Sequence, residues 1–110
     1  MNYEIHITGA AENDLNEAVD YIDQALMNPD AADRLLDLAA EKISSLTQYP
    51  ERNALVDDPV LKAWGIRFVQ VNNYLAFYTL SEEEKRVYIV RFLYGKRNWV
   101  SILKQGIILE

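Results

Sequence analysis

The sequence predicts one α+β domain spanning residues 1–110, in which a strand, a helical hairpin and a three-stranded antiparallel meander precede a short C-terminal helix. Two observations carry this prediction. Apolar residues recur at helical spacing between residues 15 and 46, whereas they alternate or run continuously between residues 65 and 94. A chain of 110 residues, half of them apolar, can also bury one hydrophobic core. The element order β-α-α-β-β-β favours one helical layer on a mostly antiparallel sheet.

The first strand is predicted over residues 2–8, where apolar and polar residues alternate. His6 lies on the polar side of this alternation and is expected to be an ordinary surface or sheet-edge residue. Thr8 suits the N-cap of a first helix, because its hydroxyl can accept a backbone N–H. The apolar stripe of that helix consists of Leu15, Ala18, Val19, Ile22 and Leu26.

A second helix begins at Asn28-Pro29, a pair that ends the first helix and supplies a cap and a first-turn proline for the next. Its outer face is acidic. Tyr49-Pro50 ends this helix, and residues 51–63 are predicted to form a loop because they show no sustained period. The apolar stripe of the second helix consists of Ala32, Leu35, Leu36, Ala39, Ile43 and Leu46.

Three strands are predicted over residues 65–71, 74–80 and 87–94. Asn72-Asn73 forms the first hairpin turn, since asparagine tolerates the positive φ angles that tight turns require. A polar turn over residues 81–86 forms the second. The middle strand is apolar on both faces, which indicates a central position in the sheet. A final amphipathic turn or short helix is indicated by Trp99, Ile102 and Leu103.

The composition excludes several classes of site. The chain has no cysteine and a single histidine, so disulfides, thiolate nucleophiles and histidine–cysteine zinc sites are not expected. The carboxylates show no metal-binding spacing, and no cofactor is expected. No apolar run is long enough to span a membrane, and the N-terminus does not resemble a signal peptide. A cytoplasmic protein is therefore expected.

Charge is distributed unevenly along the chain. Residues 1–51 carry eleven acidic and two basic side chains, a net −9, whereas residues 52–110 carry six acidic and nine basic side chains, a net +3. The second half is therefore the candidate surface for an anionic partner. The alternative interpretation is that acidic helices keep a small domain in solution.

Two arginines lie on predicted strands. Arg91 interrupts the longest apolar strand, where an unpaired charge would be costly. It is expected either to form an internal ion pair, with Asp57, Asp58 or an acid of the first helix, or to line a cleft and contact a phosphate or a partner. Arg67 is expected either to point outward or to pair with a carboxylate.

A cation pair, Lys96 and Arg97, follows the last strand and is predicted to be exposed, either as a solvated turn or as a contact surface. Tyr94 lies at the terminus of that strand. The other aromatic residues interleave with the cations, a mixture typical both of surfaces that stack bases and of core packing.

Five stretches, distributed in order along nearly the whole length of the chain, form a recognisable series: YEIHIT, AENDLNEAVDYI, Leu46 to Pro50, GIRFVQVNNYLAFY and VRFLYGKRNWVSIL. This series resembles the RelE/ParE superfamily of toxins from bacterial type II toxin–antitoxin modules. A turn followed by YLxFY and a closing strand followed by Gly-x-Arg are its most specific parts. The fold that the resemblance implies is the layer order given above.

The resemblance implies two possible activities. RelE-like and YoeB-like members cleave mRNA in the ribosomal A site with basic residues and an aromatic or imidazole group, whereas ParE-like members inhibit DNA gyrase. A nuclease of this family would use Arg67, Arg91, Arg97 and Tyr94 as catalytic residues.

Leucines occupy several positions at which the nuclease members of the family have catalytic side chains. Leu75 occupies an arginine position, Leu103 aligns roughly with a tyrosine, and Leu93 and Tyr94 stand where YoeB-like members have histidine. A leucine neither donates to a phosphate nor accepts a proton. The sequence therefore favours a toxin that binds a protein target, DNA gyrase first, over a ribosome-dependent mRNA endonuclease. A non-toxic member that serves only as a regulatory partner of its antitoxin is the third interpretation.

The partner implied by the resemblance is a cognate antitoxin whose C-terminal segment folds along the toxin. A basic groove in the second half is expected to receive an acidic amphipathic segment. The residues predicted to contact the target or the antitoxin are Lys96, Arg97, Tyr94 and Trp99.

Overall fold

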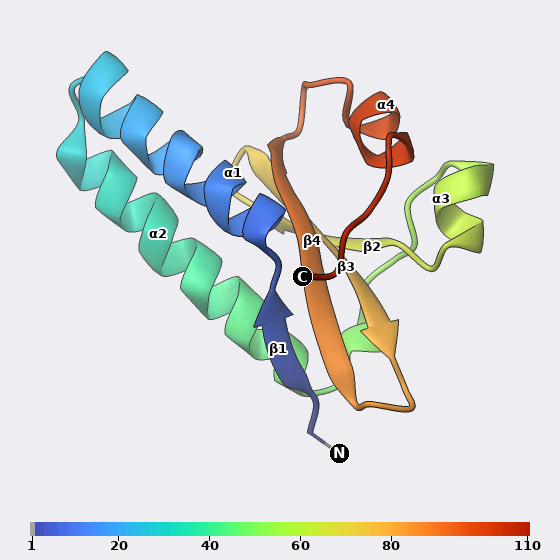
Figure 1. Cartoon of the computed structure of the whole chain (residues 1–110). Helices are drawn as coiled ribbons and strands as arrows, with labels where there is room; N and C mark the ends of the chain where they lie inside the picture. Colours follow the sequence, from blue (N-terminus) through green and yellow to red (C-terminus); the bar gives the residue numbers. More distant parts are fainter. Residues whose placement is uncertain (1) are drawn as a thin grey trace.

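Four strands and four α-helices make up the computed structural model, which describes residues 2–110 (Figure 1). In chain order the elements are β1 (Glu4–Ile7), α1 (Gly9–Asp20), a π-helical turn (Tyr21–Ala25), α2 (Pro29–Ser44), 3₁₀ turns at Ser45–Thr47 and Pro50–Arg52, α3 (Pro59–Ala63), β2 (Arg67–Val71), β3 (Tyr74–Ser81), β4 (Arg86–Tyr94) and α4 (Trp99–Lys104). The strands form one sheet in the order β1–β4–β3–β2. β1 runs parallel to β4, and the other neighbours are antiparallel. The predicted α+β fold class is thus confirmed.

Both predicted helix caps are present. The Thr8 hydroxyl oxygen accepts a hydrogen bond from the Ala11 backbone N–H at 3.3 Å, and the Asn28 side chain accepts one from Ala31 at 3.1 Å. Asn72 has a φ of 57°, as predicted for the hairpin turn between β2 and β3. Local signals therefore fixed these element boundaries.

The prediction of a loop over residues 51–63 is wrong in part, because the short helix α3 forms there. Asp58 caps it, since its Oδ2 accepts hydrogen bonds from the backbone N–H groups of Val60 and Leu61, both at 3.1 Å. Gly65 follows the helix with a φ of 75°, a conformation that a residue with a side chain rarely adopts. A helix of five residues is too short to show a hydrophobic period, so only the Asp-Pro cap signalled it.

The sheet is buried on both faces. The helices α1 and α2 lie on one side, and α3 and α4 lie on the other (Figure 1). The prediction of a single helical layer is therefore incomplete. The core on the α1–α2 side includes Ala18, Leu35, Ala39, Tyr78, Ile89 and Phe92. The core on the α3–α4 side includes Val56, Leu61, Phe77, Val90, Leu93 and Leu103. None of the helices within residues 2–110 is long and apolar enough to cross a membrane.

Thr8 joins β1, α1 and β4 at one point. Its side chain is fully buried, and its hydroxyl donates to the carbonyl oxygen of Ile89 at 2.8 Å. Its backbone N–H donates to the same oxygen at 3.1 Å. The residue therefore ends the parallel strand pair and begins the helix in a single step.

We expect the substitution Thr8→Val to lower the free energy of unfolding by about 1–2 kcal/mol, because valine has a similar shape but neither caps α1 nor bonds to β4. Urea denaturation measures this change. Thr8→Ser keeps the hydroxyl and serves as the matched control. Equal stability of the valine and serine variants would show that the hydroxyl contributes nothing.

Asp58 also connects α3 to α4. Its Oδ1 lies 3.0 Å from Nζ of Lys104. Hydrogen bonds from the backbone N–H of Leu61 and from Lys104 hold the pKa of the Asp58 carboxyl below its ordinary value. The charged form of Asp58 is thus favoured in the folded state.

The contribution of Asp58 to stability should be present at neutral pH and be lost as the pH falls below about 4, because a carboxyl with a lowered folded-state pKa takes up protons more readily when unfolded. Asp58→Asn keeps a cap acceptor but not the charge. We expect it to destabilise the protein at neutral pH and to flatten the acid limb of the stability curve, measured as urea midpoints against pH. An unchanged acid limb would contradict this role.

Candidate functional site

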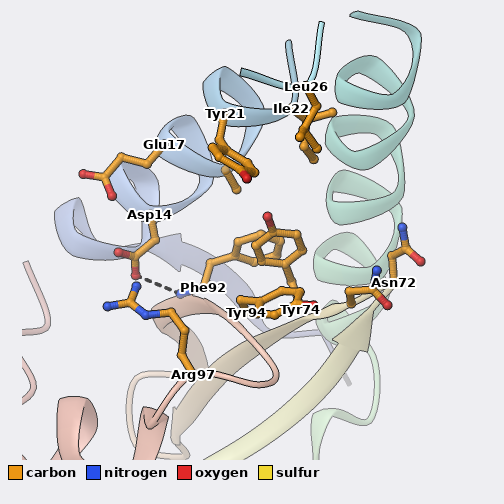
Figure 2. A pocket seen from close by; sticks show the side chains of 12 residues that line it. Asp14, Glu17, Tyr21, Ile22, Leu26, Asn72, Tyr74, Phe92, Tyr94 and Arg97 are labelled. Atoms are coloured by element: carbon orange, nitrogen blue, oxygen red, sulfur yellow. Dashed lines mark hydrogen bonds between the residues drawn. The ribbon is translucent and has the colours of Figure 1, made fainter. Parts of the chain in front are cut away.

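A groove of about 670 Å³ lies between the helical hairpin and one end of the sheet (Figure 2). Its helical wall is formed by Asp14, Glu17, Ala18, Tyr21, Ile22 and Leu26, and its sheet side by Asn72, Asn73, Tyr74, Phe92, Tyr94 and Arg97. This surface, hereafter the helix–sheet groove, joins residues that are far apart in the sequence.

Two local features shape the helix–sheet groove. The π-helical turn widens the end of α1 just where Tyr21 and Ile22 enter the wall; such turns interrupt the regular progression of side chains around a helix. On the sheet side, the backbone N–H of Gly95 donates to the carbonyl oxygen of Asn73 at 2.9 Å. A Cβ at position 95 would lie 3.3 Å from that oxygen, so glycine allows this close approach.

Aromatic rings form the floor of the groove. The ring of Tyr74 stacks on Phe92 with centroids 5.1 Å apart, and Tyr94 meets Tyr74 edge-on at 5.6 Å. Burial, together with the nearby hydroxyls of Tyr94 and Tyr21, raises the pKa of Tyr74. The uncharged form of Tyr74 is thus favoured, and the floor is an apolar, electron-rich surface.

Arg91 forms the internal ion pair that was one of its two predicted outcomes, and its partner is Asp14 of α1. Nε and Nη2 of Arg91 lie 2.6 and 2.9 Å from the two carboxylate oxygens. The backbone N–H of Phe92 donates to the same carboxylate at 3.0 Å (Figure 2). The hydrogen bonds to Asp14 raise the pKa of Arg91, which outweighs the opposite effect of its partial burial. The guanidinium is thus engaged in structure.

Arg67 departs from both of its predicted environments. Its Nη1 donates to the backbone carbonyls of Glu51 and Asn53, at 3.1 and 2.6 Å, instead of pointing outward or meeting a carboxylate. A sequence pattern identifies acidic partners but not free carbonyls, which explains the error. Val71 pairs with Tyr74 at the groove, so Arg67 lies four residues away along β2, about 13 Å.

The two cations that follow β4, Lys96 and Arg97, lie in different environments. Arg97 lies in the helix–sheet groove, where a turn closed by its N–H on the Tyr94 carbonyl, at 3.0 Å, holds it. Its side chain points toward the Asp14 end in Figure 2. Lys96 is exposed beside the groove, whereas Trp99 packs against Phe77 with ring centroids 5.1 Å apart.

The sequence did not reveal the helical wall. Tyr21 is 57% exposed and Leu26 is 56% exposed, although Leu26 belongs to the predicted core stripe. The sequence held one signal for this wall. Tyr21 lies next to Ile22 and so adds one residue to the apolar stripe of the first helix. The expected basic groove is also wrong for this cavity, because α1 contributes Asp14 and Glu17 and the second half contributes Arg97 alone among cations.

The groove offers binding groups, and the histidine and leucines discussed for nuclease members lie outside it. His6 lies on β1, against the ring of Tyr88 at 5.6 Å. Leu93 and Leu103 are fully buried, and Leu75 packs on the same α3–α4 side of the sheet. Within residues 2–110 no three potential metal ligands come together. The arrangement therefore suits recognition by aromatic and charged contacts.

The family model described as the ParE toxin of the type II toxin–antitoxin system parDE matches residues 5–99, which is most of the chain. The chain belongs to the ParE toxin family. It is accordingly a toxin of a type II toxin–antitoxin system.

Solved structures share the ParE-like fold. The chromosomal ParDE toxin–antitoxin system from P. aeruginosa is 19% identical with a TM-score of 0.69, and the match covers 86% of this chain and 97% of that one. The RelBE2 toxin–antitoxin complex from Mycobacterium tuberculosis is 18% identical with a TM-score of 0.58, and the match covers 86% and 99%. No curated protein sequence matches the chain significantly.

The Asp14→Ala substitution should lower the free energy of unfolding by about 2 kcal/mol, because it leaves Arg91 and the Phe92 N–H without their acceptor in a partly buried place. Urea denaturation measures this loss. Asp20→Ala makes the same change at an exposed position of the same helix, so it is the matched control and should change stability little. A loss no larger than that of the control would mean that the ion pair does not hold α1 on the sheet.

Proposed function

We propose that this ParE-family toxin inhibits growth by binding a protein target, with DNA gyrase as the first candidate, and that a cognate antitoxin neutralises it. The observation that carries the proposal is the engagement of the basic residues in structure. Arg91 is bound by Asp14 and Arg67 by two backbone carbonyls, and of the residues from 2 to 110 Arg97 is the one cation that lines the helix–sheet groove.

Phosphodiester cleavage requires more functional groups on a surface than binding does. It needs a proton acceptor for the 2′-hydroxyl and a donor for the leaving group, both near one phosphate. Tyr94 and Arg97 share the groove, but Arg67 lies about 13 Å away along the strand. This dispersal disfavours the ribosome-dependent mRNA endonuclease, which is the alternative function.

Target contact is assigned to Tyr94, Arg97 and Lys96, with Trp99 holding the following helix in place. Tyrosine and arginine are enriched among the residues that dominate protein–protein binding energy. Tyr94 is 37% exposed, and both cations are exposed. The antitoxin partner is supported by the family description and by the two similar solved structures, both of toxin–antitoxin systems.

Inhibition of gyrase supercoiling by the purified protein tests this proposal. We expect inhibition, and we expect Arg97→Gln to raise the concentration needed about tenfold, because a central interface arginine typically contributes more than 1 kcal/mol. Arg34→Gln makes the same charge change on the outer face of α2 and should leave inhibition unchanged.

Two companion measurements separate the alternatives. Full gyrase activity at large toxin excess, together with new codon-positioned mRNA 5′ ends after induction, would support the endonuclease instead. Normal growth after expression without an antitoxin would eliminate both toxic activities and leave a regulatory partner. Growth arrest with an unchanged transcript map is the outcome that the proposal requires.

A further inference from the structure

Three tyrosines from separate elements meet in the helix–sheet groove. Tyr21 comes from the π-helical turn, Tyr74 from the start of β3 and Tyr94 from the end of β4 (Figure 2). Tyr74 and Tyr94 meet edge-on, and Tyr21 and Tyr94 are both exposed to solvent. The face of a tyrosine ring carries partial negative charge, so converging rings favour a cation between them.

The helical wall adds full negative charge. No lysine or arginine occurs between Gly9 and Asp33, whereas the wall itself contributes Asp14 and Glu17. Asp14 is neutralised by Arg91. Glu17 is exposed and forms no ion pair with any residue from 2 to 110. Glu17 therefore adds a negative charge to the helical wall, one helical turn before Tyr21.

Charge and shape divide the groove into two parts. Arg97 points toward the Asp14 end of the groove (Figure 2), where it repels a second cation, so the opposite end, beside Tyr21, is the part suited to positive charge. Ile22 and Leu26 continue the same wall as an apolar surface. A ligand matching both would carry a cation next to an aliphatic group.

We infer that the helix–sheet groove binds an arginine or lysine side chain that follows an aliphatic residue on a segment of the neutralising partner, an inference that rests on the proposed function. The cation lies against the rings of Tyr21, Tyr74 and Tyr94, with the charge of Glu17 one helical turn earlier on the same wall, and the aliphatic residue packs on Ile22 and Leu26.

Titration of the whole protein with two short probes tests the inference. N-acetyl-Leu-Arg-amide carries the cation, and N-acetyl-Leu-citrulline-amide has nearly the same shape without the charge. NMR spectra report the ring signals of Tyr21, Tyr74 and Tyr94. We expect these signals to move with the arginine probe, and we expect its affinity to exceed that of the citrulline probe about fivefold.

Variants locate the site without disturbing the fold. Glu17→Gln should weaken binding of the arginine probe about threefold, whereas Glu41→Gln, the same change on the exposed face of α2, should not alter it. Tyr21→Leu keeps an apolar side chain but removes the ring, and it should abolish most of the preference for arginine over citrulline.

Four outcomes would overturn the inference: equal affinity for the two probes, tighter binding of N-acetyl-Leu-Glu-amide, no shift at probe concentrations up to about 50 mM, or tyrosine shifts that follow only protein concentration, as in self-association. Because the titration contains neither gyrase nor an antitoxin, it can fail while growth inhibition persists. Arginine selectivity without gyrase inhibition would instead leave the groove assignment intact and refute the proposed target.

Discussion

The contact on which the rest of the structure depends joins the Asp14 carboxylate to Arg91 and to the backbone N–H of Phe92. β1 pairs with β4 only as far as Ile89, and a bulge follows, so the edge of β4 would be open beyond that point. An unpaired strand edge with a partly buried charge is costly. Asp14 satisfies both groups, which fixes α1 along the second half of the edge.

The position of α1 in turn creates the helix–sheet groove. Because α1 lies along the end of β4, its π-helical turn and the β2–β3 hairpin both contribute residues to the walls of this groove. The helical hairpin and the sheet each leave some of the lining side chains of this groove unburied, notably Tyr21, Tyr74 and Tyr94. A binding surface therefore arises from the geometry of edge closure, and no catalytic residues are required to form it.

The fold places the acidic first half of the chain and part of the more basic second half on opposite sides of the groove. The acidic α1 and the more basic end of the meander face each other across the groove, with Glu17 on one side and Arg97 on the other. The cations on the strands are used internally, since Arg91 and Arg67 bind a carboxylate and two carbonyls. Charge that seemed available to a nucleic acid thus serves mainly to hold the layers and loops together.

Hydrophobic periodicity, Thr8, the Asn28-Pro29 pair and Asn72 determined the element order and most boundaries, because caps, turns and apolar stripes depend on neighbouring residues. The same local patterns carried the family resemblance that residues 5–99 confirm. Tertiary structure alone decided that Asp14 is the partner of Arg91, that carbonyls receive Arg67, and that Tyr21 joins Tyr74 and Tyr94 in one groove. These contacts join residues 14 to 77 positions apart, and their geometry depends on a bulge and a π-helical turn that leave no period in a sequence.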